Sequence, residues 1–260
     1  MSFFEIYLWA FAAIMALMTS LWIASVYLKN VSIVDMFWGV GFVVAAGVYY
    51  YFGQGYEPRK LMVTGLVAIW GLRLSVYLAW RNVGKPEDFR YQEFRRKYGA
   101  HRYWYVSFFQ TFLLQGVLMW FISAPLLGAQ YLQSSANLNF FDYLGVVVWL
   151  IGFTFEAGGD YQLARFKGNA ANKGKVLQTG FWKYTRHPNY FGDSAVWWAF
   201  GLFALAAGSY FTIIGAVLMT ALIIKVSGVA LLEKSLKTNK PEYAEYIRKT
   251  STFIPWFPKK

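Results

Sequence analysis

The sequence predicts an all-α integral membrane protein, with seven transmembrane helices and structured cytoplasmic loops. Of its 260 residues, 57% are apolar, 21% aromatic and only 15% charged, whereas soluble domains carry about 25% charged residues. The apolar residues form runs long enough to cross a bilayer, rather than a stripe that repeats every 3.6 residues. Lysine and arginine gather between alternate runs, which is the mark of cytoplasmic loops.

Seven apolar runs make up the predicted spans, and no repeat or linker divides residues 1–260 into more than one domain. The runs are 4–28, 32–52, 61–80, 107–129, 140–163, 190–207 and 210–232. The first run lacks a basic amino-terminal region and a small-residue cleavage site, so we interpret it as a retained helix and not as a signal peptide. The last two runs, joined at Gly208-Ser209, also fit a single re-entrant unit.

The basic residues predict the orientation in the membrane. Segment 81–106 holds seven of them, segment 164–189 holds six and the tail from Lys234 holds seven, whereas the opposite connections hold only Arg59 and Lys60. With seven spans, the three basic segments fall on one side, which the positive-inside rule assigns to the cytoplasm. We therefore expect a multi-pass protein of a bacterial inner membrane, with its N-terminus outside and its C-terminus in the cytoplasm.

Two of the basic segments are predicted to contain helices that cover the cytoplasmic end of the bundle. Segment 86–99 begins with proline and acidic residues and ends with basic residues before Gly99, which complements a helix dipole at both ends. Segment 236–250 is similar, with Asn239 as a candidate cap and Pro241 near the first helical position.

The net charge of +12 and the missing residue types exclude several kinds of site. Basic loops beside anionic lipid headgroups account for much of the charge, and some of these side chains could instead hold a phosphorylated ligand. The charge is spread over several loops, which argues against nucleic-acid binding. The chain has no cysteine and only two histidines, so we expect neither disulfides nor a metal site. No dinucleotide-binding glycine motif or P-loop occurs.

Ionisable residues inside the predicted spans gather near their cytoplasmic ends. A charge in the bilayer core costs at least roughly 2.5–3.5 kcal/mol on insertion scales. Snorkelling or an ion pair between helices explains each of them singly, but their clustering from five helices predicts a ligand cavity. Tyr77 lies among them, although it also fits an interfacial aromatic. The ionisable residues are Asp35, Arg73, Glu156, Asp160, Asp193, Lys225 and Glu233.

The strongest motif is residues 180–193, GFWKYTRHPNYFGD, followed by Glu233 and then by Tyr243, Tyr246 and the segment 253–256. It resembles the carboxyl-terminal signature of the steroid 5-alpha-reductase family. The stretch from Asp160 to Lys167 resembles an aspartate-tyrosine-basic stretch of the same family. Tyr77 matches the tyrosine of its third helix, and Asp35 stands where eukaryotic members carry a glutamate.

The resemblance implies a monomeric, seven-helix reductase that takes its substrate from the membrane lipid. It implies that the enzyme uses NADPH to reduce the conjugated C=C bond of a 3-oxo-Δ4 steroid or a related lipid enone. Asp35 and Tyr77 would be the catalytic donor pair toward the carbonyl oxygen, with Asp35 protonated, and Trp38 and Arg73 would contact the substrate. The residues implied to hold the cofactor are Asp160, Arg165, Lys167, Tyr184, Arg186, His187, Asn189, Asp193, Trp197 and Glu233.

Two alternatives remain open at this point. The Arg-His-Pro-x-Tyr motif at 186–190 is shared with isoprenylcysteine carboxyl methyltransferases, which bind S-adenosylmethionine. The N-terminal helices that bear Asp35 and Tyr77 favour the reductase. The histidine-rich stretch of the animal reductases is replaced here by residues 231–234, LLEK. The resemblance therefore implies nothing about contacts between this stretch and the nicotinamide. A channel or lipid-binding scaffold is the non-enzymatic alternative, but the opposite face offers no polar entry.

Overall fold

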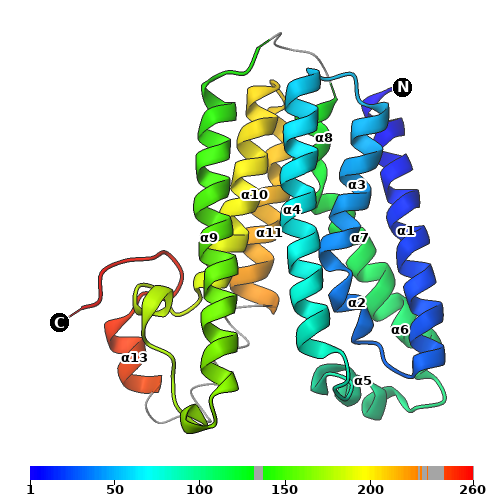
Figure 1. Ribbon diagram of the computed structural model, residues 1–260. Coiled ribbons are helices and arrows are strands. Elements are labelled where there is room, and N and C mark those ends of the chain that lie inside the picture. The colour runs from blue at the N-terminus through cyan, green and yellow to red at the C-terminus, as the bar shows by residue number, and fades with distance from the viewer. Residues whose placement is uncertain (132–136, 228, 230–232, 234–242, 260) are drawn as a thin grey trace. The chain divides into compact units, whose positions relative to one another are not determined.

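A computed structural model describes residues 1–131, 137–227, 229, 233 and 243–259. The named elements of this part of the chain are all helices, and one isolated bridge pairs Thr185 with Ser251. The helices form two compact units, which are described separately (Figure 1). The first unit comprises residues 1–138 and 203–212, and the second comprises residues 139–202 and 213–260. The all-α class predicted from the sequence is confirmed.

The first unit begins with a long apolar helix. This helix, α1 (Phe3–Leu28), is capped by Ser2 and Glu5 in a capping box and ends at Lys29, whose φ of 51° is left-handed. The helices that follow are α2 (Ile33–Met36), α3 (Trp38–Phe52), α4 (Glu57–Asn82), α5 (Phe89–Tyr98), α6 (Tyr103–Ser107), a π-helical segment (Phe108–Leu113), α7 (Leu114–Ile122) and α8 (Ala124–Gln130).

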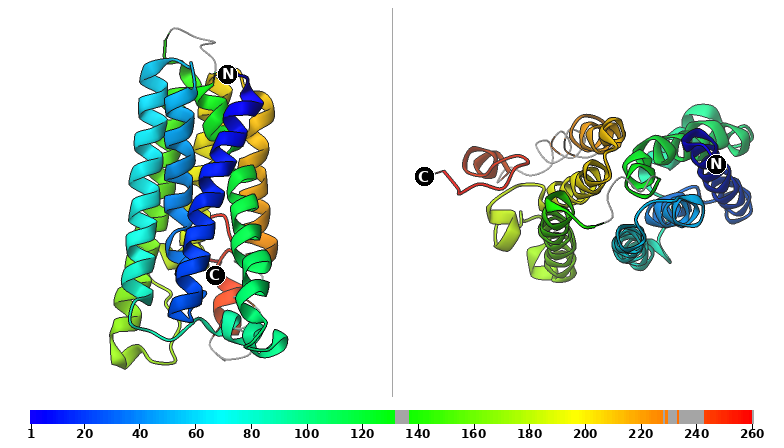
Figure 2. Two further views of the ribbon diagram at one scale, coloured as in Figure 1. Left: turned by 90° about the vertical axis from the view of Figure 1, so that its right-hand side faces the viewer. Right: turned by 90° about the horizontal axis from the view of Figure 1, so that it is seen from above.

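Two glycines bring the backbones of α3 and α4 into contact. A Cβ atom added to Gly39 would lie 2.1 Å from the carbonyl oxygen of Gly71, so no other residue fits there without moving a backbone. One turn further along α4, the hydroxyl of Ser75 accepts a hydrogen bond of 3.2 Å from the backbone nitrogen of Val40. This close packing places the start of α3, and α2 before it, beside the part of α4 that carries Arg73 and Tyr77. The long helices of this unit run side by side (Figure 2).

The second unit is built on α9 (Phe140–Gly168) and most of α10 (Pro188–Ala206). Gly152 and Gly192 let these helices touch, because a Cβ on Gly192 would lie 2.3 Å from the backbone nitrogen of Glu156. The remaining elements are 3-10 helices at Ala170–Asn172, Gly180–Lys183 and Tyr210–Ile213, α11 (Ile214–Leu222), a π-helical segment (Ile223–Ser227) and α13 (Tyr243–Lys249); the third 3-10 helix lies mainly in the first unit.

Within the described residues, each of the seven predicted spans overlaps helix, and four helices are long and apolar enough to cross a membrane. These four are Phe3–Leu28, Glu57–Asn82, Tyr103–Gln130 and Phe140–Gly168, while Trp38–Phe52 and Tyr210–Val226 are shorter apolar helices. These four candidate spans indicate a helical membrane protein, and the count of seven spans stays a prediction. The predicted loop helix in 86–99 is confirmed as α5. Of the second predicted loop helix, Tyr243–Lys249 is helical, whereas Asn239 and Pro241 lie outside the described residues.

Candidate functional site

In the first unit, the carboxylate of Asp35 is held by two side chains of α5. The hydroxyl of Tyr91 donates a hydrogen bond to Oδ1 of Asp35 at 2.8 Å, and Nη2 of Arg90 donates to Oδ2 at 3.1 Å. The Asp35 side chain is 22% exposed and that of Arg90 is 44% exposed. Asp35 thus acts as a hydrogen-bond acceptor in this arrangement, whereas the sequence predicts a protonated donor. Burial of Asp35 favours the protonated acid, whereas the guanidinium of Arg90 and the hydroxyl of Tyr91 favour the carboxylate.

Tyr91 is the functional candidate that the sequence did not indicate. It is the buried residue of α5, and Nε2 of Gln115 donates to its hydroxyl at 3.4 Å. Burial, together with the neighbouring Asp35, raises the pKa of Tyr91 well above its usual range, so that its hydroxyl stays a neutral donor. Tyr91 lies 56 residues from Asp35 in the chain, and only the docking of α5 on α2 brings the two together.

Two further contacts attach the start of α5 to the turn between α1 and α2, and an ion pair within the α5 segment holds one of the side chains involved. Oε1 of Glu87 accepts from the backbone nitrogen of Val31 at 2.8 Å, and the hydroxyl of Ser32 accepts from the backbone nitrogen of Asp88 at 2.6 Å. Arg95 binds Glu87 with two nitrogens, at 3.0 and 2.9 Å. Together with the bonds to Asp35, these contacts define what we call the α5 latch, which comprises Glu87, Asp88, Arg90, Tyr91 and Arg95.

The other catalytic and substrate candidates of this unit lie on α3 and α4. The ring of Tyr77 is half-buried, and the guanidinium carbons of Arg73 and Arg81 each lie 5.7 Å from its centroid. Such cation–π contacts hold a ring in place. Trp38 is the first residue of α3 and packs edge-on against Phe42 at 5.3 Å. The structure thus groups Arg73 with Tyr77, and it places Asp35 with Tyr91; the pairing of Asp35 with Tyr77 stays a prediction.

In the second unit, several polar side chains meet at one carboxylate oxygen of Glu233. Nε of Arg186 donates to it at 2.8 Å, the hydroxyl of Tyr243 donates at 3.0 Å, and Nε2 of His187 lies 3.2 Å away. Burial opposes ionisation of Glu233, but the hydrogen bonds and charge of Arg186 outweigh it and hold its pKa below the usual value. Burial lowers the pKa of His187, and Glu233 offsets this only partly. The cluster is therefore an ion pair of Arg186 and Glu233 beside a neutral histidine.

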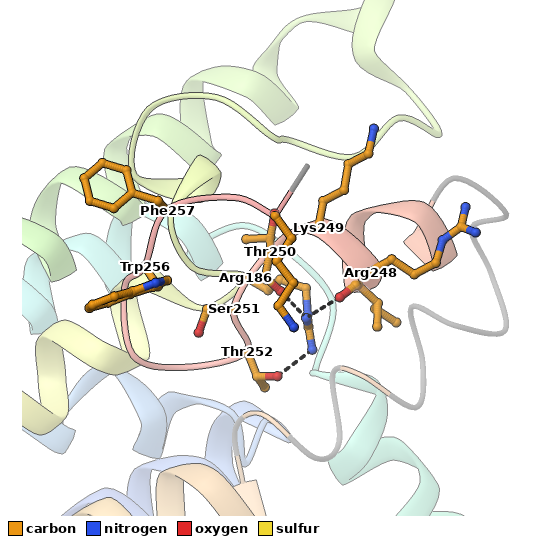
Figure 3. Close-up of a pocket in the computed structure, with 10 residues that line it drawn as sticks. Arg186, Arg248, Lys249, Thr250, Ser251, Thr252, Trp256 and Phe257 are labelled. Atoms are coloured by element: carbon orange, nitrogen blue, oxygen red, sulfur yellow. Dashed lines mark hydrogen bonds between the residues drawn. The ribbon is translucent and has the colours of Figure 1, made fainter.

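Arg186 uses the rest of its guanidinium to hold the segment after α13. Nη1 donates to the carbonyl oxygens of Ile247 and Thr250, at 3.2 and 2.5 Å, and Nη2 donates to the hydroxyl of Thr252 at 2.7 Å. Figure 3 shows these contacts around the arginine. The side chain is 6% exposed. Arg186 and Glu233 were both predicted to hold a cofactor, and each is engaged within the protein.

Asp160 and Asn189 meet where α9 passes the start of α10. Nδ2 of Asn189 donates to Oδ1 of Asp160 at 3.1 Å. The packing is close there, because a Cβ on Gly159 would lie 3.2 Å from the backbone nitrogen of Asn189. The predicted grouping of an α9 aspartate with an α10 asparagine is therefore present in the structure.

The remaining cofactor candidates have different surroundings. Arg165 and Lys167 are exposed in the last turn of α9, and Asp193 is half-buried in α10. Tyr184 is half-buried, with its ring 6.1 Å from that of Phe257. Trp197 is fully buried and packs edge-on against Phe200 at 5.5 Å. Trp197 thus belongs to the apolar core of this unit in the arrangement described.

A basic pocket of about 400 Å³ opens beside Arg186 (Figure 3). Lys259 and the end of α13 supply positive charge, and the hydroxyls of Thr250 and Thr252 line it with the exposed rings of Trp256 and Phe257. Lys249 is paired with Glu245 at 2.7 Å, but both side chains are more than half exposed, so the pair is weak. Of the predicted cofactor residues, this pocket includes Arg186. The lining residues are Arg186, Ile247, Arg248, Lys249, Thr250, Ser251, Thr252, Trp256, Phe257 and Lys259.

Comparison with known proteins places most of the chain in one family. A family model described as "Protein of unknown function (DUF1295)" matches residues 21–250. An uncharacterized protein of Schizosaccharomyces pombe, C594.04c, is 24% identical over 260 residues, which cover 90% of this chain and 75% of the yeast protein. No solved structure matches the chain.

Proposed function

We propose that this protein, which belongs to the DUF1295 family of unknown function, is a membrane-embedded, NADPH-dependent reductase. Its substrate would be a 3-oxo-Δ4 steroid or a related lipid enone, in which the conjugated C=C bond is reduced. We further propose seven spans with the C-terminus in the cytoplasm. Reporter fusions at Arg95 and Lys175 should give cytoplasmic signals, and an external signal at either would contradict that topology.

The observation that carries the proposal is the unbalanced positive charge of the pocket beside Arg186. The charge of Arg186 is met by Glu233 and that of Lys249 by Glu245, whereas among the residues that the structure describes no carboxylate lines the pocket to balance Arg248 and Lys259. A dinucleotide with a diphosphate and a 2′-phosphate carries several negative charges, which Arg and Lys recognise. S-adenosylmethionine carries a sulfonium cation instead. The pocket therefore suits the first ligand better than the second.

The other features of the pocket also fit a nucleotide. The hydroxyls of Thr250 and Thr252 can bind phosphate oxygens, and the exposed rings of Trp256 and Phe257 offer flat apolar surface to a base. Asp160 and Asn189, which bond one another, offer further polar atoms to ribose or amide groups. When bound, NADPH supplies the hydride; the protein supplies orientation, exclusion of water and a donor for the carbonyl oxygen.

In this proposal, a donor in the first unit stabilises the negative charge that develops on the carbonyl oxygen. We assign this donor role to the Tyr77 hydroxyl, together with Asp35 in its protonated form. In the latched arrangement Asp35 accepts hydrogen bonds from Tyr91 and Arg90. Asp35 can donate only after these bonds open and the carboxylate takes up a proton, which loss of the guanidinium favours. The α5 latch would thus control when Asp35 becomes a donor.

A binding titration in detergent tests the cofactor assignment without knowledge of the natural substrate. We expect saturable binding of NADPH, weaker binding of NADH and no binding of S-adenosylmethionine. The double variant Arg248→Gln/Lys259→Gln should weaken NADPH binding by roughly tenfold or more, because contacts with charged groups are lost. The variant Lys175→Gln, which removes an exposed charge outside the pocket, is the matched control. Saturable binding of S-adenosylmethionine without NADPH binding would end the reductase hypothesis in favour of a methyltransferase.

A further inference from the structure

A second pocket, of about 460 Å³, lies in the first unit at the junction of two candidate membrane spans. One wall is the end of α1, with Ser25 and Lys29, and the other is the start of the span Tyr103–Gln130, with Tyr103, Trp104 and Ser107. Arg95 of α5 closes it. Figure 1 shows the end of α1 beside α5 and α6. Apart from Arg95, which belongs to the α5 latch, these residues have no role in the proposed reductase chemistry.

The two spans are joined next to this pocket by a tryptophan pair. The indole rings of Trp22 and Trp104 stack with centroids 6.2 Å apart, and Nε1 of Trp22 donates to the carbonyl oxygen of Trp104 at 2.7 Å. Trp104 is nevertheless 53% exposed, and the neighbouring Val26 is 39% exposed. The pocket therefore has an apolar outer edge at the end of a membrane span, which is where tryptophan rings meet lipid headgroups.

The inner part of the pocket is polar and positively charged. The guanidinium carbon of Arg95 lies 4.7 Å from the centroid of the Tyr103 ring, and Arg95 also donates to the backbone carbonyl of Lys29 at 3.4 Å. Glu87 balances the charge of Arg95, whereas no carboxylate lines the pocket beside Lys29. Lys29 is exposed and caps α1 in the left-handed conformation.

Tyr103 adds a second, independent indication of a ligand. Its side chain is 0% exposed, yet its hydroxyl has no hydrogen-bond partner within the described residues. An unpaired buried hydroxyl costs about 1–3 kcal/mol, so buried polar groups nearly always have a partner. A phosphate oxygen in the pocket would supply one. The hydroxyls of Ser25 and Ser107 donate to main-chain carbonyls and keep lone pairs that can accept from a hydroxylated headgroup.

We propose that this pocket binds the headgroup of an anionic phospholipid, with the phosphate between Lys29 and Tyr103 and the acyl chains leaving past Val26 and Trp104. The apolar edge selects a lipid over free phosphate, since a soluble anion gains nothing from it. A bound lipid would also join the end of α1 to α5 and to the start of the span Tyr103–Gln130. It would therefore stabilise the surface on which the α5 latch closes.

Native mass spectrometry and thermal unfolding of the purified protein test this proposal. Phosphatidylglycerol should bind and raise the unfolding temperature, while phosphatidylcholine and inorganic phosphate should do neither. The variant Lys29→Gln should weaken phosphatidylglycerol binding on the order of fivefold, the usual effect of one basic residue at an anionic membrane surface. Tyr103→Phe should also weaken binding while leaving the unliganded protein no less stable, because the lost hydroxyl had no protein partner.

Matched controls separate this site from general charge attraction. Lys97→Gln, the control for Lys29→Gln, removes an exposed lysine of α5 that lies outside the pocket. Tyr105→Phe, the control for Tyr103→Phe, removes an exposed hydroxyl two residues further along the chain. Both should bind phosphatidylglycerol as the wild type does. Equal losses in Lys29→Gln and Lys97→Gln would overturn the proposal in favour of diffuse attraction. Binding of inorganic phosphate with the same dependence on Lys29 would overturn the lipid and leave a free-anion site.

Discussion

The two units each contain a carboxylate held by an arginine and a tyrosine, and the arginines of the two clusters differ in their exposure to water. Asp35 is bound by Arg90 at 3.1 Å and Tyr91 at 2.8 Å, and Glu233 is bound by Arg186 at 2.8 Å and Tyr243 at 3.0 Å. The Arg90 side chain is 44% exposed, whereas that of Arg186 is 6% exposed. Similar donors therefore serve two purposes. Water can replace the contact of Arg90 with Asp35, whereas it cannot replace the buried contacts of Arg186, which act as a clamp.

The energetic reason lies in what replaces each bond when it opens. Water can solvate Arg90 as soon as it leaves Asp35, so the pair contributes little to stability and can open during function. Arg186 also holds the carbonyls of Ile247 and Thr250 and the hydroxyl of Thr252. Opening that cluster would leave several buried polar groups without partners. The first cluster can thus act as a latch, while the second fixes the structure around the basic pocket.

Replacement of each arginine by lysine should give the largest difference between the clusters. Arg186→Lys cannot reproduce the forked contacts and should destabilise the second unit by about 3–5 kcal/mol, the cost of breaking a buried ion pair. Arg90→Lys should cost less than about 1 kcal/mol. Thermal unfolding in detergent measures the stability loss of both variants. If unfolding is irreversible, the rate of trypsin cleavage near Arg248 reports the opening of the second unit instead. Equal effects of the two variants would remove the distinction between latch and clamp.

Two tyrosine variants sharpen the role of the first unit. Tyr77→Phe should lower enone reduction by about 10²–10³-fold if its hydroxyl is a donor to the carbonyl oxygen, with NADPH affinity little changed.

Tyr91→Phe should instead weaken the latch by about 1 kcal/mol, the usual net value of one hydrogen bond. Turnover of progesterone or testosterone measures the first, and hydrogen exchange of the α5 amides measures the second. A large rate loss in Tyr91→Phe with none in Tyr77→Phe would exchange their roles.

The smallest expected effect is a pH dependence confined to the second unit. Because burial lowers the pKa of His187, the unfolded chain takes up a proton below about pH 6.5 that folded His187 does not. Stability should therefore fall as the pH drops below about 6.5. Ionised Glu233, whose pKa is also lowered, extends the loss to more acidic pH. His187→Gln should flatten the upper part of this profile. His101→Gln, which changes an exposed histidine of the first unit, should leave it unchanged.

The sequence by itself determined the helical class and the approximate limits of the apolar helices. Long apolar runs can satisfy their backbone groups in a membrane only as helices, and the described part of each predicted span overlaps helix in the structure. The α5 helix was also predictable, since proline, acidic and basic residues occupy the ends that the helix dipole favours. Asp160 and Asn189 come from two separate motifs that were both predicted to hold the cofactor, and the structure brings the two side chains together.

Only the tertiary structure decided which partners the ionisable residues take. The sequence indicated Tyr77 as the partner of Asp35, which stays a prediction, and it did not indicate that Tyr91 and Arg90 of α5 bind that carboxylate. Helix periodicity shows which face of a helix is apolar, and it carries no information on which distant helix covers a given carboxylate. For the same reason, the sequence indicated Arg186 as a cofactor residue but not its partners within the protein. Arg186 is enclosed by Glu233 and the segment 247–252 because α13 packs against the 180–193 motif. This packing brings together the carbonyl oxygens and the hydroxyl that accept hydrogen bonds from the guanidinium.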